Sequence, residues 1–240
     1  MGYHLERALL LFEQSRGDLA EDELRQALAE DPDQPIAHAL LGLCLAQRKQ
    51  YQQATQEAEL AIHRAPELPF AHYVLARVLH DRNRLREATA AIEEAIRLHP
   101  HEPDYFAQLS AIHFDQRQWG AALEAAERGR QLDPDHVGCT NLRAMTLVKL
   151  GRKQEAGATI ETALARDPEN ALSHANQGWT LLAQGQETRA LEHFREALRI
   201  DPQLGWARQG VIEALKAKHV LYGLILRYFL WMSTVSRRVQ

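Results

Sequence analysis

The chain has 240 residues and a mass of 27.3 kDa, with 45% hydrophobic and 25% charged residues, a composition that is ordinary for a soluble globular protein. Its formal net charge of −4 argues against a general nucleic-acid binder, because neutralising phosphates requires a clustered cationic surface. The two cysteines, Cys44 and Cys139, provide neither a disulfide framework nor a zinc-ligand spacing.

The amino terminus shows no targeting signal. Residues 1–6 lack the basic flank and the long apolar segment of a secretory signal. The two unpaired cysteines suit a reducing compartment. We therefore expect a cytoplasmic protein.

Prolines recur every 34 residues along the chain. They occupy two phases of this period: Pro32, Pro66, Pro100, Pro134, Pro168 and Pro202, then Pro35, Pro69 and Pro103. Proline ends a helix because it has no amide hydrogen to donate, and it suits the first helical position, where that hydrogen has no partner anyway. The period predicts six units of two helices each, at residues 1–34, 35–68, 69–102, 103–136, 137–170 and 171–204.

Small residues recur in the same register. The twentieth position of each unit is alanine: Ala20, Ala54, Ala88, Ala122, Ala156 and Ala190. The eighth is always small: Ala8, Gly42, Ala76, Ser110, Ala144 and Gly178. Two antiparallel helices approach closely only where small side chains let their backbones come near. The columns therefore predict helix pairs packed through these positions, with Gly151 and Gly185 in the turns of their units.

This pattern resembles the tetratricopeptide repeat over residues 1–204, about 85% of the chain. The resemblance implies an all-α fold, a right-handed superhelical solenoid of antiparallel helix pairs whose first helices line a concave groove. Some columns depart from the family. Arg7, Arg143 and Gln177 replace the usual leucine at position seven, and histidine is frequent at position four.

Taken in chain order, the groove positions implied by the family give a mixed set of side chains. They are Phe70, Tyr73, Arg77 and Asp81 in the third unit, Phe114 and Asp115 in the fourth, Asn141, Met145 and Lys149 in the fifth, Trp179 and Leu182 in the sixth, and Trp206 just beyond it. Aromatic side chains on an open surface are candidate binding hot spots. The alternative is that some of them pack between neighbouring first helices.

The lysine and asparagine columns that form a chaperone-tail clamp in some relatives are absent. The groove positions instead place carboxylates at Asp81 and Asp115. We therefore expect a protein or peptide ligand with apolar anchors and a basic residue opposite these carboxylates.

No residue pattern indicates catalysis, a metal or a cofactor. The histidines of the fourth column, His4, His38, His72 and His174, recur at the repeat period and should lie roughly 10 Å apart, too far to share one ion. We interpret them as half-buried amphipathic side chains. The acidic pairs Asp31/Asp33 and Asp133/Asp135 lack the glycine and the distant glutamate of a calcium loop. Capping of backbone amides is the simpler interpretation.

The carboxyl-terminal segment breaks the register. Residues 205–218 fit one capping helix, and residues 219–240 form an apolar and basic tail. Its candidate membrane or self-association residues are Leu221, Tyr222, Leu226, Tyr228, Phe229 and Trp231. The apolar stretch is roughly 20 Å long as a helix, too short to span the ~30 Å bilayer core alone. Interfacial aromatics and terminal arginines suit a membrane surface.

The tail resembles, over about twenty residues, the juxtamembrane segment of some bacterial repeat proteins. It leaves three interpretations open: membrane proximity, packing on the last repeat or on a dimer partner, and insertion into a groove. We expect a non-catalytic interaction scaffold, held at the cytoplasmic membrane face. The alternative is a soluble adaptor that self-associates as a homodimer through the tail.

Overall fold

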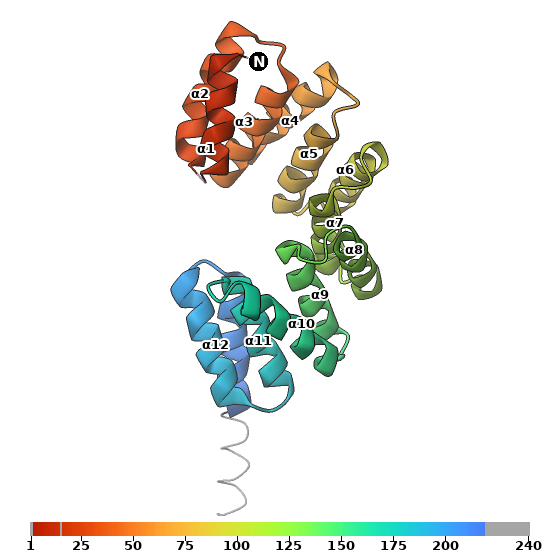
Figure 1. Ribbon diagram of the computed structural model, residues 1–240, viewed down its shortest axis with the longest axis vertical. Coiled ribbons are helices and arrows are strands. Elements are labelled where there is room, and N and C mark those ends of the chain that lie inside the picture. The colour runs from red at the N-terminus through yellow and green to blue at the C-terminus, as the bar shows by residue number, and fades with distance from the viewer. Residues whose placement is uncertain (1, 15, 219–240) are drawn as a thin grey trace, which may run out of the picture. The chain divides into compact units, whose positions relative to one another are not determined.

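The computed structural model describes residues 2–14 and 16–218, and this part of the chain is helical without any β-strand. Residues 205–218 are helical. The other helices (Figure 1) are α1 (Tyr3–Glu13), α2 (Gly17–Glu30), α3 (Pro35–Gln47), α4 (Tyr51–Arg64), α5 (Pro69–Asp81), α6 (Leu85–Leu98), α7 (Pro103–Asp115), α8 (Trp119–Leu132), α9 (Val137–Lys149), α10 (Lys153–Arg166), α11 (Ala171–Ala183) and α12 (Glu187–Ile200). The prediction of an all-α fold of helix pairs is confirmed.

Prolines mark where several first helices begin. Pro35, Pro69 and Pro103 are the first residues of α3, α5 and α7, where a missing amide hydrogen costs no intrahelical bond. The second helices end just before the other proline column, because proline disfavours the helical backbone in the residue that precedes it. Proline spacing therefore sets the length of each helix pair.

The turn inside the helix pairs uses a left-handed backbone at the fifteenth position of the unit. The φ angle there is 60° at Lys49, 58° at Asn83, 60° at Arg117, 75° at Gly151 and 74° at Gly185. Glycine adopts this region at no steric cost, whereas a side chain crowds the following carbonyl. The sequence indicated the turn at the two glycines, and the same backbone occurs in three units that lack glycine there.

The core of each unit lies where the two helices of a pair meet. The alanines of the twentieth column are fully buried, at 0% exposure: Ala20, Ala54, Ala88, Ala122, Ala156 and Ala190. The twenty-fourth column is equally buried and includes Leu24, Ile92, Ile160 and Phe194. Burying one such large side chain contributes about 1.5–3 kcal/mol. Alternation of small and large columns therefore stabilises the pairs.

Three histidines of the fourth column, His38, His72 and His174, connect successive repeats. Their Nε2 atoms donate to a proline carbonyl six residues earlier: His38 to Pro32 at 2.9 Å, His72 to Pro66 at 2.7 Å and His174 to Pro168 at 2.9 Å. Arg208 Nε donates to the Pro202 carbonyl at 3.0 Å in the same way. A carbonyl after a helix end needs a donor, so this column has a defined structural role that its interpretation as amphipathic filler missed.

The acidic pairs form local turns. Asp31 Oδ1 accepts the amide of Asp33 at 3.2 Å, and Asp133 Oδ1 accepts the amide of Asp135 at 2.9 Å. An aspartate that accepts an amide two residues later stabilises a turn without any ion.

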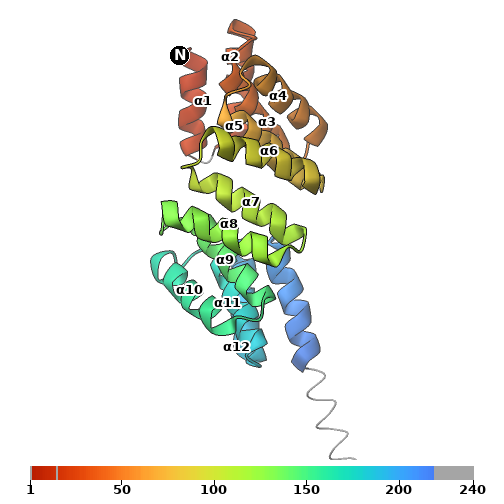
Figure 2. The same ribbon diagram turned by 90° about the vertical axis from the view of Figure 1, so that its right-hand side faces the viewer.

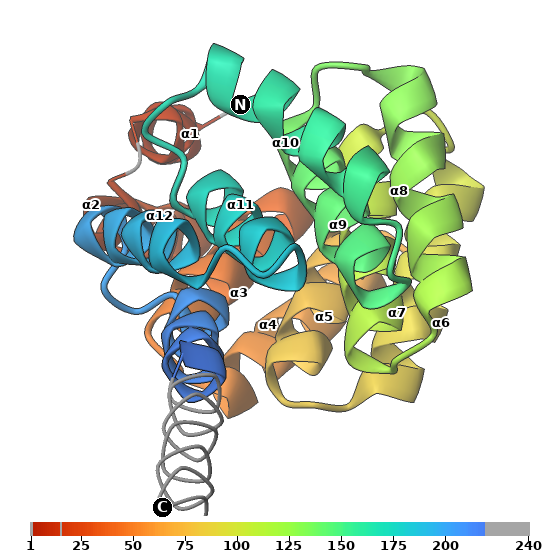
Figure 3. The same cartoon turned by 90° about the horizontal axis from the view of Figure 1, so that it is seen from below.

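The described helices belong to two compact units, Met1–Cys139 (unit 1) and Thr140–Gln240 (unit 2), whose boundary falls within α9. In unit 1, α6, α7 and α8 are packed one after another (Figure 2). In unit 2, α11, α12 and the helix of residues 205–218 lie next to one another (Figure 3) and share one apolar cluster. The tail candidates Leu221, Tyr222, Leu226, Tyr228, Phe229 and Trp231 lie outside the described residues.

Candidate partner-binding surfaces

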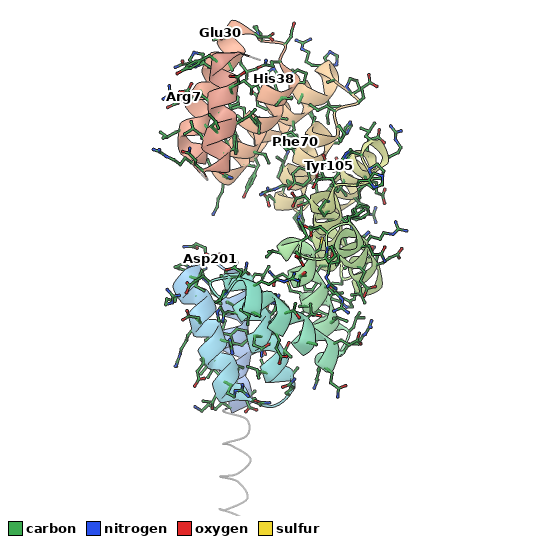
Figure 4. The ribbon with its side chains drawn as sticks, in the orientation of Figure 1. Arg7, Glu30, His38, Phe70, Tyr105 and Asp201 are labelled. Atoms are coloured by element: carbon green, nitrogen blue, oxygen red, sulfur yellow. The ribbon has the colours of Figure 1, made fainter. Side chains whose placement is uncertain are left out.

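An aromatic row crosses from α5 to α7 in unit 1. The rings of Phe70 and Tyr73 are stacked with centroids 6.1 Å apart, and those of Tyr73 and Tyr105 are 5.3 Å apart. Figure 4 labels the two ends of the row, Phe70 on α5 and Tyr105 on α7. Phe70 and Tyr73 are half-buried, whereas Tyr105 is 7% exposed. The row therefore consists of two half-buried rings packed beside a buried third ring.

Burial keeps the hydroxyls of the two tyrosines protonated. Burial raises the pKa of Tyr73, and the Arg77 guanidinium, hydrogen-bonded to this side chain, lowers it in part. Burial, followed by the nearby Glu102 carboxylate, raises the pKa of Tyr105 to about 12. Both hydroxyls consequently remain protonated and present polar atoms beside an apolar row.

A histidine and two carboxylates lie at the other end of α5 and α7. His80 Nε2 donates to Asp115 Oδ2 at 2.7 Å, and the Gln108 amide donates to His80 Nδ1 at 3.1 Å. In this arrangement the Nε2 atom of His80 donates and its Nδ1 atom accepts. Asp81 is exposed, and the Asp115 side chain is 56% exposed despite its histidine partner. We call this region the α5–α7 surface: Phe70, Tyr73, Arg77, His80, Asp81, Tyr105 and Asp115.

Phe114 belongs to the interior and not to this surface. It is 8% exposed, and its ring meets the edge of Trp119 on α8 with centroids 5.0 Å apart. Phe114 thus connects α7 to the second helix of its own pair.

Two tryptophans form the corresponding feature of unit 2. Trp179 on α11 and Trp206 on the helix of residues 205–218 are both half-buried, with ring centroids 4.8 Å apart and planes inclined at 33°. The Lys149 ammonium lies 5.5 Å from the centroid of Trp179 and 4.8 Å from that of Trp206. We call the two rings the tryptophan cradle. It places three of the predicted groove residues in direct contact.

Both indole N–H groups of the cradle are hydrogen-bonded. Trp179 Nε1 donates to the Trp206 carbonyl at 3.1 Å, and Trp206 Nε1 donates to Asn176 Oδ1 at 2.9 Å. The rings of Trp179 and Phe194 form a T-shaped pair with centroids 5.7 Å apart. These contacts fix the orientation of the two rings.

A buried polar network supports Asn176. Its Nδ2 donates to Asn141 Oδ1 at 3.1 Å, and Ser173 Oγ donates to the same oxygen at 3.0 Å. Asn141 Nδ2 in turn donates to Asn170 Oδ1 at 3.3 Å. Asn141, Ser173 and Asn176 are at most 2% exposed. Asn141, expected in the groove, is therefore buried and positions the cradle through Asn176.

The remaining predicted groove residues lie beside these features. Met145 and Leu182 are half-buried, and Leu182 packs against the apolar cluster of unit 2. Sequence reasoning missed Tyr105, Gln108 and Asn176, which fall outside the family's groove positions. A signal existed for Asn176, because a packed tryptophan requires an acceptor for its N–H.

A shallow hollow of about 420 Å³ lies beside α4, α5 and α6 in unit 1. Its apolar wall includes Ile62, Leu75 and Leu79, and its rim carries Glu59 and Glu94. No residue pattern in the sequence indicated this hollow.

Within the described residues, no three histidine, cysteine, aspartate or glutamate side chains are grouped so that they could hold a metal ion. No helix of this part is both long and apolar enough to cross a membrane.

Comparison with family models gives two matches. A model described as the tetratricopeptide repeat matches residues 5–69 and 141–204, together more than half of the chain. A model of subunit 3 of the anaphase-promoting complex, or cyclosome, matches residues 91–163. No curated protein matches the sequence.

Several solved structures share the fold. YrrB, described as a TPR protein with an unusual peptide-binding site, is 22% identical, with 82% of this chain and 97% of YrrB covered at a TM-score of 0.56. A chain of the APC/C hetero-tetramer Cut9–Hcn1 is 16% identical, with 88% and 42% covered and a TM-score of 0.75. PilF of Pseudomonas aeruginosa is 19% identical, with 86% and 94% covered and a TM-score of 0.67. At these identities the likeness establishes the fold alone.

Proposed function

Because the chain belongs to the tetratricopeptide-repeat family, whose members are generally non-catalytic protein-interaction scaffolds, we propose that it binds a protein or peptide segment on its first helices. The observation that carries this proposal is the pair of half-open aromatic features, the α5–α7 surface and the tryptophan cradle. Large aromatic side chains that are left partly exposed lose contact with water when a partner covers them. The peptide-binding site named for YrrB, a protein of similar fold, supports a peptide as the ligand.

The charges beside the aromatic features favour a ligand with basic residues. Asp81 and Asp115 present exposed carboxylates at one end of the α5–α7 surface, and the cradle already holds the ammonium of Lys149. A ligand cation is attracted to carboxylates and to the faces of indole rings. The ligand is therefore a segment that combines aromatic or aliphatic anchors with lysine or arginine.

Selection from a displayed random-peptide library tests this proposal. The baits are the full chain, the double variant Tyr73→Ala/Trp179→Ala, and Leu60→Ala, which changes an exposed leucine on the second helix α4. We expect basic peptides with apolar anchors to be enriched on the full chain and on Leu60→Ala, and to be lost on the double variant. Equal capture by all three baits refutes the proposed binding face.

The cellular placement of the scaffold is a proposal from the tail composition. We propose tethering at the cytoplasmic membrane face, which flotation with liposomes tests by comparing the full chain with one that ends at Lys218. Equal flotation of both forms refutes the membrane tether.

The alternative, self-association through the tail, requires that light scattering detects a dimer of the full chain and a monomer of the shortened one.

A further inference from the structure

We propose that the tryptophan cradle is a subsite for an alkylammonium group, a lysine side chain of the bound segment, and that Lys149 occupies this subsite in the free protein as an internal competitor. The inference rests on the proposed function, since it names the chemistry that one part of the binding surface recognises. It concerns unit 2 alone.

The geometry matches a compact cation. The Lys149 ammonium and the centroids of the two rings are separated by 4.8, 5.5 and 4.8 Å, so the three points form a nearly equilateral triangle. The ring planes are inclined at 33°, and the cation is within reach of both π faces at once. An ammonium is a compact point charge that interacts with both rings. A guanidinium is planar and gains most by stacking flat on a single ring.

The rings are held in place before any ligand arrives. Their N–H groups are bonded to the Trp206 carbonyl and to Asn176, and Asn176 belongs to the buried network through Asn141. Trp179 also packs on Phe194. A preorganised pair of rings loses little conformational entropy when a cation binds, so most of the contact energy appears as affinity.

The Lys149 ammonium, in contrast, is suited to move away from the two rings. It is exposed and is the last residue of α9, and its ammonium is carried on a flexible four-carbon stem. Its present position shows which chemical group the cradle accepts. Replacing it with an identical group from a ligand exchanges the cation–π contacts of one ammonium for those of another, at the cost of releasing Lys149 from the cradle and from its other interactions.

Self-occupancy predicts that removing Lys149 strengthens ligand binding. The apparent affinity of a site is reduced by the fraction of molecules in which it is open. An exposed cation–π contact of ~0.5–1 kcal/mol between Lys149 and the rings corresponds to about a three- to sixfold reduction in the apparent affinity for the ligand. Lys149→Met should therefore bind an ammonium probe about three- to sixfold more tightly than the unaltered chain.

The experiment is an NMR titration of the full chain with a capped glycine–lysine–glycine peptide. Versions with norleucine, arginine or trimethyl-lysine in place of lysine serve as comparison probes. We expect the lysine methylene resonances of the probe to shift upfield in the ring currents of the indoles. Trimethyl-lysine should bind at least as well as lysine, because a cation–π contact needs no N–H donor. The norleucine peptide should not bind measurably, and the arginine peptide should bind more weakly.

Lys153→Met is the matched control. It removes the same charge from the same unit, but the Lys153 ammonium contacts the Ala183 carbonyl and neither ring. The proposal predicts unchanged probe affinity for this variant and a gain for Lys149→Met. Equal affinities of the unaltered chain and Lys149→Met overturn the competition by Lys149. Equal binding of the norleucine or arginine peptide overturns the ammonium subsite.

A structural role for Lys149 gives a different result. If the cation–π contact only connects α9 to the two tryptophans, Lys149→Met lowers the thermal midpoint without any gain in probe binding. Failure here is separable from failure of the proposed function. If capture of the library peptides depends on Tyr73 but the lysine probe shows no shift at the cradle, the proposed scaffold function stands and the ammonium subsite is refuted.

Discussion

At the scale of single residues, three of the 34-residue repeats have a residue other than glycine in a strained backbone conformation at their fifteenth position. Lys49, Asn83 and Arg117 have the same left-handed backbone as Gly151 and Gly185. A side chain in this region costs roughly 1–2 kcal/mol relative to the right-handed region, and asparagine tolerates it best. The strain should therefore be largest at Lys49 and Arg117.

Replacing Arg117 with glycine should stabilise unit 1. We expect Arg117→Gly to raise the free energy of unfolding by about 0.5–1 kcal/mol, because glycine relieves the backbone strain but loses more entropy on folding. Arg117→Ala is the control, since alanine keeps the strain, and its urea midpoint should not rise. A lower or unchanged midpoint for Arg117→Gly would show that the turn stores no such strain.

A histidine pair in unit 2 should make stability depend on pH. His193 Nδ1 and His174 Nδ1 are 3.1 Å apart, and His174 Nε2 donates to the Pro168 carbonyl. His174 therefore accepts a hydrogen bond through Nδ1, and His193 donates it. Burial, followed by the charges of His174 and Arg189, lowers the pKa of His193 below its ordinary value of 6.5.

The sign of the effect follows from proton linkage. Since the pKa of His193 is lower in the folded state, the unfolded state binds more protons, and the contribution of His193 to stability is lost as the pH falls below about 6.5. We expect the urea midpoint to fall between pH 7 and pH 5. The variant His193→Gln should show a smaller fall over the same range. Identical pH profiles for the two proteins would exclude His193 as the cause.

At the scale of helix pairs, unit 2 combines its largest core ring with its smallest neighbours. A Cβ at Gly178 would lie 2.6 Å from the Phe194 ring, and one at Gly210 would lie 2.2 Å from it. Units with alanine at the eighth position have a smaller core residue at the twenty-fourth, as in the pairs Ala76/Ile92 and Ala144/Ile160. Gly178 and Phe194 therefore share one volume in the sixth repeat, whereas in the second repeat Gly42 is combined with the small Ala58.

Gly178→Ala should destabilise unit 2 by about 1–3 kcal/mol through overpacking. Adding Phe194→Ile should recover part of this loss, because the pair then matches the other units, and a double-mutant cycle of urea midpoints measures the coupling. Gly120→Ala is the matched control, since a Cβ there meets nothing within 4 Å. Additive effects of the two substitutions would show that the columns are independent.

The proline and small-residue columns of the sequence predicted the helix pairs, because helix ends and close helix contacts constrain residue type strongly. It did not predict the bonds from His38 and His72 to proline carbonyls, since a histidine column is equally compatible with a packed or a solvated side chain. The role of Asn141 was also missed. Its burial depends on Ser173 and Asn176 of the next helix pair, which no single column shows.

At the scale of the whole molecule, repeat periodicity determines the fold, and neighbouring helices determine the site. Tyr73 and Trp179 are half-buried, whereas Phe114 is buried and packs against Trp119 of its own pair. Positions on one face of a helix differ in exposure because the side chains that cover them come from other helices. The family's groove positions therefore select candidates, and packing decides which of them remain accessible.

The central claim is that the first helices carry the partner-binding surface. The most direct measurement is the dissociation constant, by isothermal titration calorimetry, of the tightest library peptide for the full chain, Tyr73→Ala, Trp179→Ala and Leu60→Ala. We predict that at least one of the variants Tyr73→Ala and Trp179→Ala weakens binding about tenfold or more, the effect of losing a hot-spot aromatic, whereas Leu60→Ala changes it less than about twofold. Unchanged binding by both aromatic variants, or a large loss for Leu60→Ala alone, would contradict the claim.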